Sequence, residues 1–126
     1  MNPQRSRSRA ASFGHALAGL AYVVRSQRNA WIHAIASATV VLLALWLRLG
    51  RTDWALLFLA MSLVWMAEFI NSALEATVDL ASPEAHPLAK VGKDVGAAAV
   101  LIAAASAALV GLLVLGPPLA QRVWGG

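Results

Sequence analysis

Five polar side chains recur along residues 68–79 of this 126-residue chain, within an otherwise apolar stretch. They are Glu68, Asn71, Ser72, Glu75 and Asp79. In an α-helix, where each residue turns by about 100°, all five share an arc of about 100°. Two carboxylates one or two helical turns apart hold a divalent cation through oxygen atoms, the ligands that Mg²⁺ requires. The spacing therefore predicts a metal-dependent site along one helix face.

A second group of charged residues, Lys90, Lys93 and Asp94, follows a loop that contains two prolines. Lysines supply positive charge for a polyphosphate, and the helix that starts near residue 88 adds the positive end of its dipole. Carboxylates, Mg²⁺ and lysines are the parts that phosphoryl transfer uses. The chain has no P-loop, because the Gly-Lys pair before Asp94 lacks the earlier glycine. Any ATP is therefore expected to bind to another architecture.

The elements that position these residues are long apolar runs. The chain is 60% hydrophobic and 13% charged, whereas soluble domains carry about 25% charged residues. It has no cysteine, which excludes disulfides, thiolate metal sites and cysteine nucleophiles. This composition is typical of a small integral membrane protein.

Residues 1–9 (MNPQRSRSR) are predicted to be a disordered basic tail, and residues 10–126 a single membrane domain. Three spans are expected, at about 30–48, 54–79 and 88–115. The second continues into the cytoplasm without a break, and Gly-Pro-Pro ends the third. Residues 10–28 have helical spacing but are too polar to span. They are predicted to lie on the membrane surface, or alternatively to pack on the bundle.

Seven of the ten Lys and Arg residues lie in the N-terminal segment and near the Pro-containing loop. This bias places both in the cytoplasm, where ATP is found. The basic tail precedes apolar spans, so anionic lipid is the expected partner and nucleic acid is not. Gly92 and Gly96 have the spacing of a small-residue packing seam. A homo-oligomer is expected, because three spans have little interior from which to build a site.

Residues 68–79 (EFINSALEATVD) resemble the signature of prokaryotic diacylglycerol kinases, E-x-hydrophobic-N-[ST]-[SA]-hydrophobic-E-x-x-V-D. Residues 86–94 (HPLAKVGKD) resemble that family's second block, in the form of its undecaprenol kinase branch. The resemblance covers residues 10–118. It implies an all-α homotrimer in the bacterial cytoplasmic (inner) membrane, with sites shared between subunits. It also implies MgATP-dependent phosphorylation of a lipid alcohol, undecaprenol or diacylglycerol, at the cytoplasmic face.

The same resemblance implies a role for each matched residue. Glu68 corresponds to the general base that accepts the proton of the lipid hydroxyl. Glu75 corresponds to the principal metal-binding carboxylate, and Asn71 positions the substrate or the γ-phosphate. The remaining matches belong to the nucleotide site or to the loop of the branch, and they are Asp79, Lys93, Asp94, His86 and Lys90.

The chain departs from the family pattern at one position. The family has a second metal-binding glutamate just before the first span, and residues 25–33 (RSQRNAWIH) put Gln27 in that place. Glutamine offers Mg²⁺ a neutral carbonyl oxygen in place of a charged ligand. Weaker metal binding or an inactive relative is therefore an alternative to full kinase activity.

Two other classes of protein compete with a kinase. A small channel or proton-coupled transporter explains intramembrane carboxylates, but it requires polar residues along the whole depth of a span. Ser62 is the one polar residue between Trp54 and Ala67, and the third span has Ser106. A purely structural assembly protein gives no reason for three carboxylates on one arc.

Overall fold

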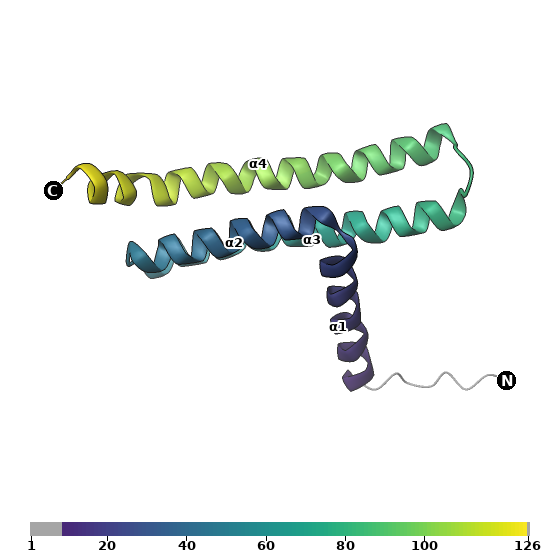
Figure 1. The fold of residues 1–126 in the computed structure, drawn as a ribbon, viewed down its shortest axis with the longest axis horizontal. Helices are drawn as coiled ribbons and strands as arrows, with labels where there is room; N and C mark the ends of the chain where they lie inside the picture. Colours follow the sequence, from purple (N-terminus) through teal and green to yellow (C-terminus); the bar gives the residue numbers. More distant parts are fainter. Residues whose placement is uncertain (1–8, 126) are drawn as a thin grey trace.

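The computed structural model describes residues 9–125, and all regular structure within that range is helical. Its helices are α1 (Arg9–Ser26), α2 (Arg28–Trp46), α3 (Arg51–Ala81) and α4 (Pro87–Trp124). Helices α2, α3 and α4 form an antiparallel bundle, from which α1 projects (Figure 1). These three bundle helices are long and apolar enough to cross a membrane, in agreement with the predicted number of spans. The predicted basic tail lies almost entirely outside the described residues.

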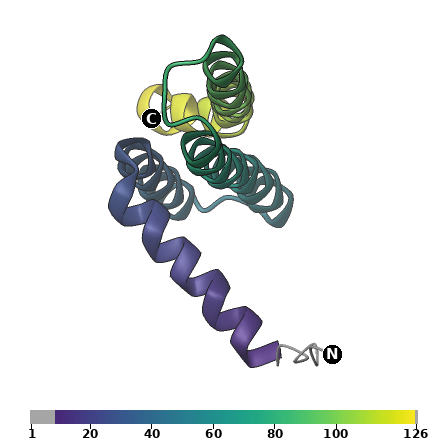
Figure 2. The ribbon, with the colours of Figure 1, turned by 90° about the vertical axis from the view of Figure 1, so that its right-hand side faces the viewer.

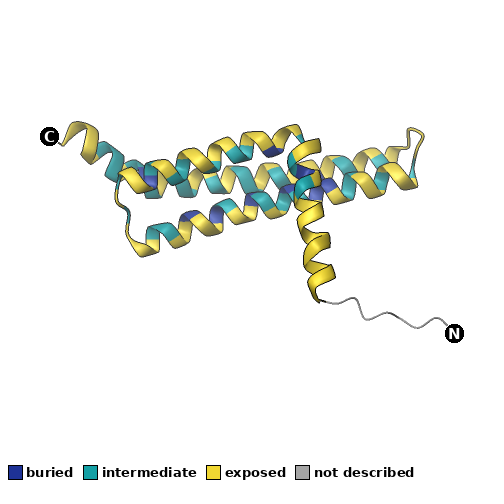
Figure 3. Cartoon of the chain, turned by 60° about the horizontal axis from the view of Figure 1, so that its bottom comes forward, coloured by how far each residue is buried: buried dark blue, intermediate teal, exposed yellow. Residues whose placement is uncertain are grey.

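Helix α3 is the central element of the bundle. It has 31 residues, about 46 Å of helix, and therefore exceeds a hydrocarbon core of about 30 Å. The predicted unbroken continuation through residue 79 is confirmed. The helix begins at Arg51, three residues earlier than predicted, because the Trp54 N–H donates to the Gly50 carbonyl at 3.1 Å. Its buried residues lie along one face, from Leu57 to Ser72 (Figure 3).

A tight turn joins α2 to α3. Arg48 has a left-handed backbone (φ 53°), and its N–H donates to the Leu45 carbonyl. The Leu49 N–H donates to the Ala44 carbonyl, and both hydrogen bonds are 3.2 Å long. These two bonds form a Schellman motif, which satisfies the last carbonyls of α2. Leu49 then packs against a core that includes Ala44 and Leu57, so the turn holds α2 antiparallel to α3.

The third span is predicted to end at residue 115, but the helix that contains it is longer. Helix α4 continues through Pro117 and Pro118 to Trp124. Proline removes one backbone donor but has a helical φ, and spanning helices tolerate it where other groups satisfy the freed carbonyl. The final turns bend away from the main axis (Figure 3), as is usual at prolines. The Arg122 guanidinium lies 5.1 Å from the centre of the Trp46 ring, which holds the extension against the end of α2.

Helix α1 contacts α2 but leaves the bundle at once (Figure 2). Val23 is its buried residue, whereas Phe13 and Leu17 are 67% and 51% exposed. The alternative in which this helix packs along its own bundle is therefore wrong. Its apolar side chains remain available to lipid, and its position on the membrane surface stays a prediction.

Candidate active site

Glu68 lies on the buried face of α3 and is 1% exposed. Its Oε2 is 3.5 Å from Nε2 of His33 on α2. Within the described part of the chain, neither atom has a hydrogen-bond partner. A buried carboxylate costs several kcal/mol unless it meets a partner, an ion or water. Such a group contributes nothing to stability by itself, so its position indicates chemistry.

Asn71 lies almost one helical turn beyond Glu68 and faces α4. Its Nδ2 donates to Oε1 of Glu75 at 3.1 Å. Its Oδ1 is buried, with no hydrogen-bond partner among residues 9–125. Gly96 of α4 packs directly against this oxygen, and a Cβ atom at that position would overlap it. The close approach of α4 to the amide therefore depends on glycine.

The small-residue seam of α4 lies against α3 of the same chain. Gly96 meets Asn71, and a Cβ atom at Gly92 would contact Val78 at 3.7 Å. The spacing therefore serves helix packing within one chain, by the close backbone approach that small residues allow. Ser72 shares the buried arc, and its Oγ donates to the Glu68 carbonyl at 2.8 Å.

The polar arc of α3 becomes more exposed along its length. Glu68, Asn71 and Ser72 are buried, Glu75 is half-buried and Asp79 is exposed. All five residues lie on one face of α3. Its first part faces the neighbouring helices, and its last part faces the space beyond them. The arrangement is a ladder of polar groups that leads from the interior of the bundle to its end.

A charged cleft of about 660 Å³ lies where α3 ends, the loop turns and α4 begins. Its polar lining includes Asp79, His86, Lys90, Lys93 and Asp94. Lys93 pairs with Asp79 across the two helices, and Lys90 pairs with Asp94 along α4. Exposed ion pairs of this kind add little to stability. A bound phosphate can therefore replace the carboxylate as the partner of either lysine. The structure thus brings five of the predicted site residues into one cleft, whereas Asn71 and Glu68 lie deeper along α3.

His86 also has a structural role that the sequence pattern did not indicate. It is the N-cap of α4, and its Nδ1 accepts a hydrogen bond from the Leu88 N–H at 3.1 Å. Pro87 follows as the first helical residue, where its missing N–H has no cost. The ring is therefore fixed at the rim of the charged cleft.

The two predicted metal ligands are both half-buried. Asn71 holds Oε1 of Glu75, and Gln27 is the N-cap of α2 without using its side chain as a cap. Carboxylate and amide oxygens are hard donors that suit Mg²⁺, so the chemistry of this pair fits the ion. Across residues 9–125, no three His, Cys, Asp or Glu side chains gather around one point. Of the two predicted ligands, Glu75 carries a negative charge and Gln27 is neutral.

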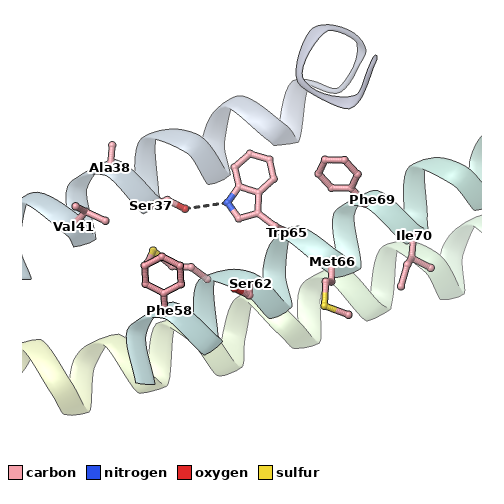
Figure 4. A pocket seen from close by; sticks show the side chains of 10 residues that line it. Ser37, Ala38, Val41, Phe58, Ser62, Trp65, Met66, Phe69 and Ile70 are labelled. Carbon is pink, nitrogen blue, oxygen red and sulfur yellow. Dashed lines mark hydrogen bonds between the residues drawn. The ribbon is translucent and has the colours of Figure 1, made fainter. Parts of the chain in front are cut away.

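An apolar groove of about 760 Å³ runs between α2 and α3 (Figure 4). Phe58, Trp65 and Phe69 line it, and the Trp65 Nε1–H donates to Ser37 Oγ at 3.2 Å. The Trp65 ring also stands edge-on to His33, with ring centroids 6.2 Å apart. Trp65 therefore connects the lining of the groove to His33, which is not itself part of that lining.

His33 is the site residue that the sequence analysis missed. Two signals could have found it. It is an ionisable residue within the first span, and it lies one helical turn before Ser37 on the face of α2 that meets α3. Periodicity alone does not show which α3 residue such a face will meet.

Comparison with known proteins agrees with this architecture. The profile of the prokaryotic diacylglycerol kinase family matches residues 14–115. Undecaprenol kinase of Bacillus subtilis is 37% identical over 108 residues, which cover 86% of this chain and 88% of that protein. Diacylglycerol kinase of Synechocystis sp. is 43% identical over 109 residues, 86% of this chain but only 62% of that protein. Diacylglycerol kinase of Escherichia coli (strain K12) is 38% identical over 89 residues, 65% of this chain and 73% of that protein.

The family profile extends from α1 to the last part of α4. It includes the buried carboxylate, the charged cleft and the apolar groove between α2 and α3. The chain therefore belongs to the prokaryotic diacylglycerol kinase family and is a lipid kinase with membrane-spanning helices.

Proposed function

We propose that the protein transfers the γ-phosphate of ATP, with Mg²⁺, to the hydroxyl group of undecaprenol or diacylglycerol. The reaction takes place at the cytoplasmic face of the bacterial inner membrane. The observation that carries the proposal is Glu68, a buried carboxylate on the same helix as the charged cleft. Asp79 lies eleven positions after Glu68, about 16 Å along the helix. A lipid hydroxyl and a nucleotide can therefore meet along a single polar arc.

Glu68 accepts the proton of the lipid hydroxyl while the hydroxyl oxygen attacks the γ-phosphorus and ADP leaves. Asn71 holds Glu75 and positions the substrate or the γ-phosphate. Glu75 and, more weakly, Gln27 would hold Mg²⁺, and the ion would supply positive charge for the phosphate groups. The nucleotide occupies the charged cleft, among Asp79, His86, Lys90, Lys93 and Asp94. Positioning and electrostatic stabilisation supply most of the rate in such transfers.

Charge distribution supports the orientation. The N-terminus of α2 and the loop between α3 and α4 lie at the same end of the bundle (Figure 1). Arg122 lies beside Trp46, at the other end with Arg48 and Arg51. Among the described residues, five basic side chains belong to the segment before the first span and to the region of this loop, against three on the other side, and this bias favours a cytoplasmic N-terminus.

A homotrimer with shared sites is part of the proposal. The glycine seam of α4 is used within the chain, but another part of the same helix remains uncovered. Ala97, Ala98 and Ala105 are exposed there, and small residues allow close packing between spanning helices. A second subunit on this surface would lie beside the charged cleft and could complete it.

A channel or proton-coupled transporter fits the bundle less well than a kinase. At the end opposite the charged cleft, Ala44, Leu57 and Leu115 form an apolar core. Ser62 lines the apolar groove and is not part of a continuous polar path. The polar residues of α3 instead lead from the buried carboxylate toward the cleft, which suits an enzyme that works at one membrane face.

Transfer of labelled γ-phosphate from ATP to lipid tests the proposal directly. The purified full chain is assayed with undecaprenol and with diacylglycerol in the same detergent. Mg²⁺-dependent label in one of the two lipids is the expected result, and the faster reaction identifies the acceptor. Absence of label from both lipids, with a known kinase active in the same mixture, would overturn the proposal.

Gln27→Glu is expected to keep or raise activity, with the largest gain at low Mg²⁺. The substitution restores a charged oxygen ligand at the position where the family has one. Half-saturating Mg²⁺ is measured at fixed ATP and should fall. Gln121→Glu, an exposed position near the end of α4, makes the same change in charge and should leave the Mg²⁺ dependence unaltered. A clear loss of activity in Gln27→Glu would mean that this side chain is not a ligand.

Ala38→Trp is expected to raise the KM for the lipid about tenfold, while the KM for ATP stays constant. Ala38 lines the apolar groove, where we place the hydrocarbon chain of the substrate. Displacing two methylene groups from that groove costs about 1.6 kcal/mol, which corresponds to roughly tenfold in affinity. Ala36→Trp is the matched control, because Ala36 is exposed on the same helix outside the groove. An unchanged lipid KM in Ala38→Trp would place the chain elsewhere.

A further inference from the structure

The two buried atoms that face each other across α2 and α3 form an incomplete contact. His33 Nε2 and Glu68 Oε2 are 3.5 Å apart, somewhat longer than an N–H···O hydrogen bond of about 2.7–3.2 Å. Neither has another partner in the described part of the chain. One is a ring nitrogen and the other a carboxylate oxygen, so a single proton between them satisfies both. A small movement of either side chain closes the gap.

The charged groups around Glu68 leave it dependent on His33. From α2 the facing ionisable group is His33 itself, at 15% side-chain exposure. On α3 the next carboxylate is Glu75, two helical turns away and bonded to Asn71. On α4, Lys93 pairs with Asp79, three turns from Glu68. Within residues 9–125, no other basic side chain lies within ion-pair distance of Glu68.

The position of the imidazole is set by its neighbours on α3. The Trp65 ring lies edge-on to His33 at an interplanar angle of 67°. Trp65 is in turn fixed by its hydrogen bond to Ser37, one turn further along α2. The contact of Trp65 with α2 therefore also orients the His33 ring, with its Nε2 atom toward Glu68.

We propose that His33 is a positioning residue that serves Glu68 as a proton partner. This inference rests on the proposed role of Glu68 as the base. The lipid O–H bond breaks as its oxygen bonds to the γ-phosphorus and the bond to ADP breaks. The proton moves to the Glu68 carboxylate, which shares it with His33 Nε2 until the phosphorylated lipid leaves.

His33→Gln and His33→Phe test the inference together. Glutamine keeps a polar group without the titrating ring, and phenylalanine keeps a ring against Trp65 without a proton site. Both are expected to lower kcat about 10–100-fold, less than the roughly 10²–10⁴-fold contribution of a general base itself, with the KM for ATP within about twofold of the parent value. The pH–rate profile should shift, because the ring that shares the transferred proton with Glu68 is removed.

His15→Gln is the matched histidine control, because His15 is exposed on α1, and its kcat and pH profile should equal those of the parent chain. A His33→Phe variant with near-parent kcat and an unshifted profile would show that the ring only packs, and would overturn the inference. If phenylalanine prevents folding, the glutamine variant decides by the same two readouts. A parent chain that transfers no phosphate means that the proposed function fails. An active parent with unaffected His33 variants means that only this inference fails.

Discussion

The Glu68→Ala variant is expected to lose all measurable turnover while it binds nucleotide almost as well as the parent chain. A positioned general base contributes about 10²–10⁴-fold in rate, and no other described carboxylate lies near His33. The charged cleft begins about 16 Å further along α3, so the nucleotide contacts are untouched. Lipid phosphorylation measures the first effect, and the affinity for a fluorescent ATP analogue measures the second.

The same substitution should leave the fold intact, and this separates chemistry from structure. Removing a buried carboxylate that lacks a hydrogen bond relieves a desolvation cost and does not break a stabilising contact. The thermal midpoint Tm in detergent should therefore stay constant or rise. Glu68→Gln keeps the volume and should lose the same activity, whereas Asp53→Asn, in the first turn of α3, should retain it. Near-normal turnover in Glu68→Ala would remove Glu68 from its role.

The polar arc of α3 could be predicted from the sequence because it depends only on helical periodicity. Residues three, four, seven and eleven positions apart share a face in any α-helix, whatever packs against them. The charged cleft could also be anticipated, because a short loop brings the end of one helix to the start of the next. Both features are local along the chain, and the structure preserves them.

The partners of the arc could not be predicted in the same way. His33 and Glu68 are 35 residues apart, and their contact depends on how α2 lies against α3. Gly96 is one of many small residues in α4, and only the docked helix shows that it faces Asn71. The sequence does not predict that α4 continues past Pro117, for a related reason. Rules for proline in isolated helices omit the contact between Arg122 and Trp46 that holds the extension.

Gly96→Ala is expected to lower turnover about tenfold or more and to lower Tm by several degrees. A Cβ atom at this position overlaps Asn71 Oδ1 and presses on Leu74. The amide must rotate, which breaks its hydrogen bond to Glu75 and misplaces the proposed metal ligand. Overpacking of a helix interface costs about 1–3 kcal/mol, more than the gain of about 1 kcal/mol from replacing glycine within a helix.

Gly111→Ala on the same helix is the matched control, because nothing lies within 4 Å of a Cβ atom there. It gains the same helix propensity without a clash, so its Tm should rise slightly and its turnover should be unchanged. A double-mutant cycle with Asn71→Ala then tests the route of the effect. If Gly96 acts through the amide, the double variant loses less activity than the two single losses combined. Full activity in Gly96→Ala would mean that the orientation of Asn71 does not matter to phosphoryl transfer, and independent losses would mean that α4 acts on the site by another contact.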